Sequence, residues 1–473
     1  MNNLLLKFIE FALGNGIALI LGFISSPIIT RLVIPEEFGK FSMFNTVTNL
    51  LLIIVMLGLD QSYVRFFYEE KEEDRGKLLR KTIKYPLIAN IILSILLVIF
   101  YKPMSEVIVG KYSFFVIVLL IIQNTFSLIN RFACLIIRME QKGKVYSLIQ
   151  VLTKLFYIIF VLLLFKIFNR DYRTLVVAIT LATVITTIMA VMVEKRQWFS
   201  FQQNDKLKTS TKELFLFGMP LILSTAITWI FQSTDRFFIS AYSGYTELGI
   251  YSSAFSIVAL LNAVQGTFTT FWVPVANEKY QENPNDTKFF EDINAIISLV
   301  MLIIATLLIT SKDLLVLLLG SKYRDASFIF PFLVFMPIMY TISETTVLGI
   351  NFKKKTKYHI WIAVISAITN FIGNYLLVPS MGAKGAAIST GLSYVVFFAI
   401  RTIISKRLYN VNYNLRRFSI CTIFMIILSI YASLYEFNII LPILGLITLI
   451  VILISYKFTI IKYWKQVKYK FKK

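Results

Sequence analysis

The chain has 473 residues, of which 57% are hydrophobic and only 16% are charged. Soluble domains carry about a quarter of charged residues, so this composition excludes an ordinary soluble protein and predicts one that crosses a membrane many times. The net charge of +22 does not indicate nucleic-acid binding, because no gap between the apolar stretches is long enough for a separate soluble module.

Apolar segments follow one another along the whole chain, and each is long enough for one membrane crossing of about 20 residues. We therefore predict an all-α polytopic membrane protein with about 14 transmembrane helices. The predicted segments are 8–30, 41–62, 86–101, 114–137, 147–168, 174–193, 214–242, 249–275, 293–311, 327–350, 359–378, 386–404, 418–435 and 438–456.

Basic residues are distributed unevenly between the two sides of the membrane. Most of the 48 Lys and Arg residues fall on the side that holds the N-terminus, the connections after even-numbered segments and the basic tail 457–473. The positive-inside rule then predicts that both termini are cytoplasmic, and the basic runs read most simply as topology signals and contacts with anionic lipid. Three cations, Arg131, Lys154 and Arg236, lie within the segments and more than three residues from either segment end.

The seventh segment is apolar yet carries Asp235 and Arg236 side by side. A charge in a membrane helix costs about 2.5 to 3.5 kcal/mol on insertion scales, so such residues usually face a bundle interior, an aqueous cavity or each other. Thr228 and Gln232 lie on the same helix face as Asp235. One side of this helix is therefore predicted to be polar.

The sequence also contains an internal repeat. Residues 27–47 resemble residues 233–258, so that Arg31 matches Arg236 and Gly39 matches Gly249. We predict two pseudo-symmetric six-helix bundles, residues 1–205 and 206–407, followed by two additional transmembrane helices and the basic tail in residues 408–473. Because six is an even number, the bundles should be parallel repeats about an axis along the membrane normal, an arrangement that commonly encloses a cavity near the midplane.

Several motifs together resemble a known family. They are the GxPLxxS run at 218–224, the Asp235 and Arg236 pair, the GxxxxGxYxxA run at 244–254, the stretch 374–390 and the stretch 27–39. With these motifs in their order along the sequence, the chain is similar, over essentially its whole length, to Wzx-type oligosaccharide flippases. These belong to the polysaccharide transporter branch of the superfamily that also holds multidrug and toxin exporters and lipid II flippases.

This resemblance implies a MATE-like pair of bundles that opens a central cavity to one face of the membrane and then to the other. It implies a bacterial cytoplasmic membrane protein that turns an undecaprenyl-diphosphate-linked oligosaccharide from the inner to the outer leaflet, for capsule or O-antigen synthesis. Polymerases and glycosyltransferases are the partners to expect, and no cofactor is implied. In the family, helices one, two, seven and eight line the cavity.

Cations outnumber acids among the embedded and boundary residues, which suits an anionic diphosphate because Arg can clamp its oxygens bidentately. We predict Arg31, Arg65 and Arg236 as headgroup contacts, with Arg131 and Lys154 as further cations of the cavity. The alternatives are that Arg236 pairs with an acid, that Arg65 is an interfacial topology residue, that Arg31 extends to the surface, and that Arg131 and Lys154 join helices to an acid.

Uncharged polar residues predict a path for the glycan, since sugar hydroxyls need donors and acceptors. The candidates on segments two, seven and eight are Asn45, Asn49, Asp60, Gln232, Ser256, Asn262 and Gln265. For any one of them, hydrogen bonding between helices is the competing role.

Energy coupling has two candidate sites. The resemblance implies a sodium site formed by Asp235, Asn374 and Thr390, but Val378 stands where a second acid would be expected. Glu344, beside Ser343 and Thr345, is the candidate for proton coupling, with a structural hydrogen-bonding role as its alternative. An inside-negative potential would also favour outward movement of an anionic headgroup by about 2.3 kcal/mol per charge at 100 mV.

Two other classes compete with a flippase. A multidrug or cation antiporter of the same superfamily would need an acidic cavity, against which the basic excess argues. A membrane-embedded glycan polymerase or ligase should show a sizeable outer loop, whereas the longest gap, 194–213, is predicted to be cytoplasmic. No nucleotide-binding motif, metal-ligand cluster or nucleophilic triad is visible, so we predict a protein that is not an enzyme and holds no metal.

Overall fold

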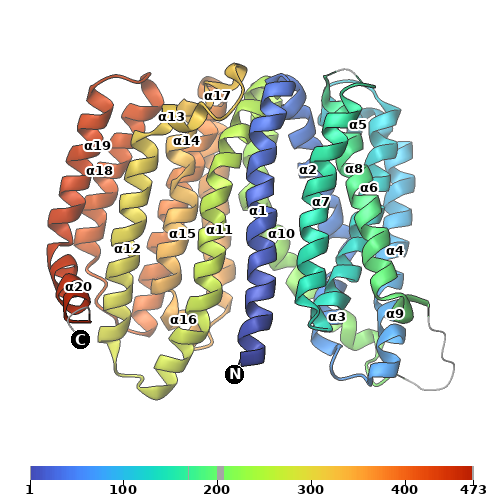
Figure 1. Ribbon diagram of the computed structural model, residues 1–473, viewed down its shortest axis with the longest axis horizontal. Helices are drawn as coiled ribbons and strands as arrows, with labels where there is room; N and C mark the ends of the chain where they lie inside the picture. The colour runs from blue at the N-terminus through green and yellow to red at the C-terminus, as the bar shows by residue number, and fades with distance from the viewer. Residues whose placement is uncertain (1, 169, 200–206, 471–473) are drawn as a thin grey trace. The chain divides into compact units, whose positions relative to one another are not determined.

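The computed structural model describes residues 2–168, 170–199 and 207–470, without the side chains of residues 2–15, 263 and 465–470. Helices make up this part of the chain, and no strand occurs in it (Figure 1). The predicted all-α membrane architecture is therefore confirmed. It follows from the solvent, because in hydrocarbon each backbone N–H and C=O must be paired within the protein, which a helix achieves along its own length.

The helices form two compact units, Met1–Arg236 and Phe237–Lys473, which we call unit 1 and unit 2. Unit 1 contains α1 Asn2–Leu32, α2 Pro35–Met56, α3 Leu59–Phe66, η1 Glu72–Asp74, α4 Arg75–Ile99, α5 Tyr101–Val109, α6 Phe114–Met139, α7 Gly143–Leu164, α8 Tyr172–Val193, α9 Lys195–Phe199 and most of α10 Thr211–Tyr242. Unit 2 contains α11 Gly244–Glu282, α12 Thr287–Thr310, α13 Lys312–Val316, η2 Ser321–Tyr323, α14 Ala326–Leu333, α15 Phe335–Thr346, α16 Leu348–Phe352, α17 Lys357–Leu408, α18 Leu415–Leu434, α19 Ile440–Ser455 and α20 Lys457–Lys470.

The number of membrane crossings agrees with the sequence. Eleven helices in the described part are long and apolar enough to span a bilayer, and α19 with α20, which meet at a bend of 66°, add a twelfth. The 52-residue helix α17 is broken at Gly382, where φ is 56° and ψ is −136°, so it supplies two crossings. With the 31-residue helix α1, the prediction of about 14 spans is reached.

Within each unit the helices pack as a bundle. In unit 1, α1 packs mainly on α7, while α6, α7 and α8 pack on one another and α2 contacts α5, α6 and α8 (Figure 1). In unit 2, α15 packs on α11, α12 and α17, and the two C-terminal helices α18 and α19 pack on each other and on α12. The division at Arg236 falls inside α10, whereas the predicted six-helix halves divide at residue 205. Those sequence halves remain a prediction.

Candidate substrate-binding site

A close backbone contact fixes α10 against the end of α2. Leu57 and Gly58 both have positive φ, 51° and 66°, and so break the helix between α2 and α3. A Cβ on Gly58 would lie 2.2 Å from the carbonyl oxygen of Gly218, so only glycine permits this approach. The Ser62 hydroxyl adds a 2.6 Å hydrogen bond to the carbonyl oxygen of Leu214.

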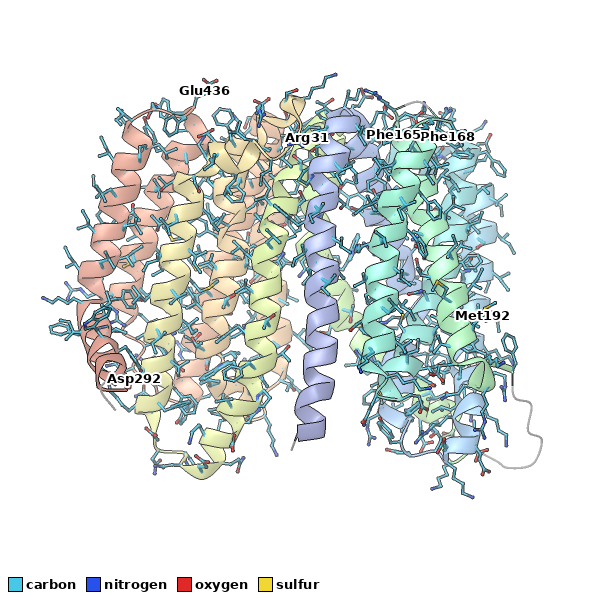
Figure 2. All side chains as sticks on the ribbon, viewed as in Figure 1. Arg31, Phe165, Phe168, Met192, Asp292 and Glu436 are labelled. Carbon is cyan, nitrogen blue, oxygen red and sulfur yellow. The ribbon has the colours of Figure 1, made fainter. Side chains whose placement is uncertain are left out.

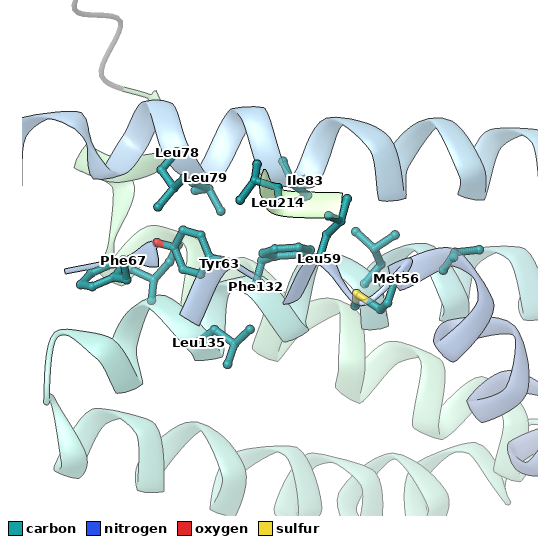
Figure 3. Packing of buried hydrophobic residues seen from close by; sticks show 13 residues of the cluster. Met56, Leu59, Tyr63, Phe67, Leu78, Leu79, Ile83, Phe132, Leu135 and Leu214 are labelled. Carbon is teal, nitrogen blue, oxygen red and sulfur yellow. The ribbon is translucent and has the colours of Figure 1, made fainter. Parts of the chain in front are cut away.

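A buried apolar cluster fixes the other side of the short helix α3. Figure 3 shows Tyr63 of α3 between Phe67 and Phe132, with Leu214 of α10 approaching from another direction. The Tyr63 ring meets Phe67 and Phe132 edge-on, at centroid separations of 5.5 and 6.0 Å. Helices α3, α4, α6 and α10 are therefore joined into one packed layer of unit 1.

A pocket of about 170 Å³ lies beside this joint, within unit 1. Its wall divides into an apolar part from α2 and α10 and a polar part around the start of α3. The lining residues are Leu52, Ile53, Met56, Gly58, Asp60, Gln61, Arg131, Leu221, Ile222 and Thr225. An apolar wall with a few convergent polar groups is the usual form of a small-ligand site.

Asp60 and Arg131 form an ion pair in the wall of this pocket. The Oδ2 atom of Asp60 accepts from Arg131 Nη2 at 2.9 Å and Nε at 3.1 Å, and also from Gln61 Nε2 at 3.0 Å. The carboxylate side chain is 10% exposed and the arginine side chain 44%. Arg131 thus joins α6 to an acid, which was the alternative role given for it above. It also lines the pocket.

The structure does not bring Arg31 and Arg65 together. Arg31 is exposed in the last turn of α1, at one edge of unit 1 (Figure 2). Arg65 is in the last turn of α3, which lies toward the opposite edge, the edge at which the N-terminal end of α1 also lies (Figure 1). Arg65 forms a 2.5 Å ion pair with Glu69, and both side chains are about half exposed. In this conformation the two arginines cannot contact the same phosphate.

The remaining predicted cations have different surroundings. Arg236, the last residue of unit 1, is half-buried and donates from Nη1 to the carbonyl oxygen of Gln232 at 3.0 Å, while its neighbour Asp235 is buried. Lys154 is exposed on α7. Neither Lys154 nor Arg31 forms an ion pair with an acidic residue in the described part of the chain.

The predicted glycan-path residues fall in both units. Asn45 and Asn49 lie on α2, half-buried and exposed respectively, and Gln232 is exposed on α10. In unit 2, α11 carries three half-buried members of the set, Ser256, Asn262 and Gln265. Of the seven, only Asp60 lines the pocket described above.

Glu344 lies in a buried network of unit 2. Its carboxylate is 2.8 Å from Arg401 Nη1, and the two side chains are 6% and 8% exposed. Arg401 also donates to Ser343 Oγ at 2.5 Å, and its guanidinium lies over the rings of Tyr340 and Phe397. Arg401 was absent from the cations that the charge pattern identified within segments. The sequence signal that could have identified it is an arginine near the end of the twelfth segment, 386–404, together with an acid in the tenth segment, 327–350.

The candidate ion-coupling residues Asn374 and Thr390 are linked through Asn370 in unit 2. Asn370 Nδ2 donates to Thr390 Oγ1 at 3.2 Å, and Asn374 Nδ2 donates to Asn370 Oδ1 at 3.1 Å. Val378, one helical turn beyond Asn374, is fully buried. Asp235 belongs to unit 1, so the predicted site of Asp235, Asn374 and Thr390 stays a prediction.

The fold is shared with solved structures of membrane transporters. It superposes on a solved structure described as "Lipid II flippase MurJ, inward closed conformation" with a TM-score of 0.72 and 15% sequence identity, covering 97% of this chain and 99% of that one. An inward-facing multidrug resistance MATE family transporter of the MOP superfamily superposes with a TM-score of 0.58 and 15% identity, over 82% of this chain and 94% of that one.

The sequence defines the family. Residues 4–279 match the family described as "Polysaccharide biosynthesis protein", and the chain belongs to it. A curated relative in Haloferax volcanii, described as "Probable low-salt glycan biosynthesis flippase Agl15", is 20% identical over 254 residues, which are 52% of this chain and 53% of that protein. The chain thus matches about half the length of this relative. The resemblance to the polysaccharide transporter branch is confirmed.

Proposed function

We propose that this protein flips undecaprenyl-diphosphate-linked oligosaccharide repeat units from the inner to the outer leaflet of a bacterial cytoplasmic membrane by alternating access. Both termini lie in the cytoplasm, and the exported units feed a surface polysaccharide such as capsule or O-antigen. The family match over residues 4–279 and a relative described as a glycan biosynthesis flippase support this proposal.

The observation that carries the choice of substrate is the pairing of two membrane acids, Asp60 and Glu344, with arginines. Asp60 is paired with Arg131, and Glu344 is paired with Arg401. Arg31 and Lys154 have no such acidic partner in the described residues. Positive charge is therefore left available for an anionic ligand, and a diphosphate offers oxygens that arginine can bind bidentately in a partly desolvated site.

The same observation argues against a multidrug or cation antiporter. A cationic drug needs a carboxylate whose negative charge is not already neutralised, yet the carboxylates of Asp60 and Glu344 are each paired with a guanidinium. Removing a cation's water without an opposite charge to replace it is costly. The fold alone does not decide between these classes, since multidrug transporters share it.

The separation of Arg31 and Arg65 suggests an order of contacts. On the proposed topology Arg65 is at the cytoplasmic edge and Arg31 at the outer edge, so Arg65 meets the headgroup at entry and Arg31 at exit, with Arg236 as the third contact. The membrane potential contributes to turnover by drawing the anionic headgroup outward. Coupling to Na⁺ through Asp235, Asn374 and Thr390, or to H⁺ through Glu344, is the second candidate driving force.

Export of surface glycan in a strain lacking its own copy of this gene tests the proposal. Replacement of Arg31, Arg65 and Arg236 by alanine, singly and together, should lower surface glycan at unchanged protein level. Arg173→Ala is the matched control, because Arg173 is likewise an exposed arginine at a helix end, held by Asp171. Normal glycan export in the triple variant, together with lost resistance to cationic drugs, would establish the antiporter instead.

A further inference from the structure

We propose that the pocket between α2, α3, α6 and α10 is a saccharide subsite, which holds one sugar ring of the lipid-linked oligosaccharide through Asp60 and Arg131. This inference rests on the proposed function and adds a specific place for the sugar. The headgroup cations and this subsite are different parts of the molecule, and each can be tested without the other.

Asp60 and Arg131 each keep a hydrogen-bonding atom that no described residue uses. Three donors from Arg131 and Gln61 converge on Oδ2 of Asp60. Among the described residues none donates to Oδ1 of Asp60 and none accepts from Nη1 of Arg131. An acceptor and a donor therefore stand side by side in the pocket wall. Two neighbouring sugar hydroxyls match them, because one can donate to the carboxylate while the other accepts from the guanidinium.

The pocket wall carries no net charge at Asp60 and Arg131. Asp60 and Arg131 neutralise each other, so this part of the wall offers no net positive charge to a phosphate. An anion placed here would meet the carboxylate as well as the guanidinium. A neutral group with several hydroxyls avoids that repulsion and uses both partners. The pocket therefore favours the sugar over the diphosphate, in contrast to Arg31, which has no acidic partner among the side chains that the structure describes.

The pocket also has the size and the wall that one sugar ring requires. A water-sized group needs about 10 to 15 Å³ of such space, so the 170 Å³ of the pocket admits roughly a dozen non-hydrogen atoms, the size of one hexose ring. The apolar wall of Leu52, Ile53 and Leu221 suits the C–H faces of the ring, and the hydroxyl of Thr225 adds one more polar group. Aromatic rings are absent from the lining given by the described residues, which favours weak binding and hence release.

The walls of the pocket are rigid where α10 meets the start of α3. The pocket wall contributed by α10 follows directly after Gly218, whose contact with Gly58 leaves no room for a side chain on either residue. Ser62 and Leu214 fix the same pair of helices by a hydrogen bond. Two walls of the pocket are therefore held in place before a ligand arrives, so that little ordering cost accompanies binding.

Binding to the full-length protein in lipid nanodiscs tests the subsite with two probes. One probe is lipid-linked oligosaccharide extracted from glycan-producing cells, and the other is undecaprenyl diphosphate, which lacks the sugar. The wild type should bind the first about tenfold more tightly, as expected for hydrogen bonds to charged groups. Asp60→Asn and Arg131→Gln should remove this preference, and Thr225→Val, which leaves the ion pair intact, should reduce it.

A charge exchange separates binding from folding. The double variant Asp60→Arg, Arg131→Asp restores an ion pair, so a purely structural pair predicts recovery of both the melting temperature and the sugar preference. The subsite predicts recovery of the melting temperature alone. The inference is overturned if the wild type binds both probes equally, or if the single variants keep the tenfold preference. If the wild type binds neither probe, the proposed function itself fails.

Discussion

The buried ion pair of Glu344 and Arg401 allows a quantitative prediction for unit 2. Glu344→Gln keeps the size of the side chain but removes its charge, so the guanidinium of Arg401, 8% exposed, loses its counter-ion. Breaking a buried pair by removing one partner costs about 3 to 5 kcal/mol, because the remaining charge is buried without compensation. The contacts of Arg401 with Ser343 and two aromatic rings place the expected loss toward the lower value.

This loss is measurable as a shift in the melting temperature of the purified protein. For a unit of about 200 residues, 1 kcal/mol corresponds to about 2 to 4 °C, so Glu344→Gln should melt roughly 10 °C below the wild type. Size-exclusion chromatography after heating in detergent provides the assay. The double variant Glu344→Gln, Arg401→Met removes both charges and should melt closer to the wild type than Glu344→Gln alone.

Two results would refute this reasoning. One is a melting temperature of Glu344→Gln within 2 °C of the wild type, and the other is a double variant that melts below the single one. Glycan export by the double variant then decides the role of Glu344. Retained export indicates that the pair stabilises unit 2, whereas loss of export in a stable double variant favours proton coupling.

Three further predictions concern stability. Gly58→Ala should lower the melting temperature by several degrees, because the new Cβ would overlap a backbone oxygen and residue 58 has a positive φ. Gly22→Ala is the control and should leave the melting temperature unchanged, since no atom lies within 4 Å of a Cβ there. Equal effects of the two substitutions would contradict the close contact. Glu70→Gln should cost about 1 to 3 kcal/mol, since its buried carboxylate accepts the backbone N–H groups of 208–209, and an unchanged melting temperature would refute that role. Burial lowers the pKa of Lys312 from its ordinary value of 10.5. At alkaline pH below 10.5 the unfolded chain therefore keeps a proton on Lys312 that the folded protein releases. The stability of the wild type should rise with pH in this range and level off above 10.5. Lys312→Met should melt higher than the wild type at neutral pH and lack this rise; a lower melting temperature would be the contrary result.

The membrane architecture was predictable because it depends on properties that extend over many residues. Hydropathy and charge asymmetry gave about 14 segments, and the structure contains a matching set of long apolar helices. Helix boundaries were harder to predict. The segments 359–378 and 386–404 join in α17, where only the positive φ of Gly382 marks the break. The predicted tail continues α19 as a bent helix.

The candidate site was less predictable, since it depends on contacts between segments that are distant in the sequence. The charge pattern identified Arg131 as an embedded cation, with an acidic partner as one alternative, but it could not choose Asp60, 71 residues away, as that partner. It passed over Arg401 because this residue stands three residues from the end of segment 386–404, although the structure buries it against Glu344. The contact of Gly58 with Gly218 leaves no signature in either segment alone.

Transport in proteoliposomes tests the central claim most directly. Lipid-linked oligosaccharide from glycan-producing cells is incorporated with the purified protein, and the fraction of sugar accessible to an external lectin is followed with time. We predict protein-dependent movement of the sugar between leaflets that is abolished when Arg31, Arg65 and Arg236 are replaced together. Vesicles in which the wild-type protein leaves the sugar in its original leaflet, while it moves a cationic drug, would contradict the account.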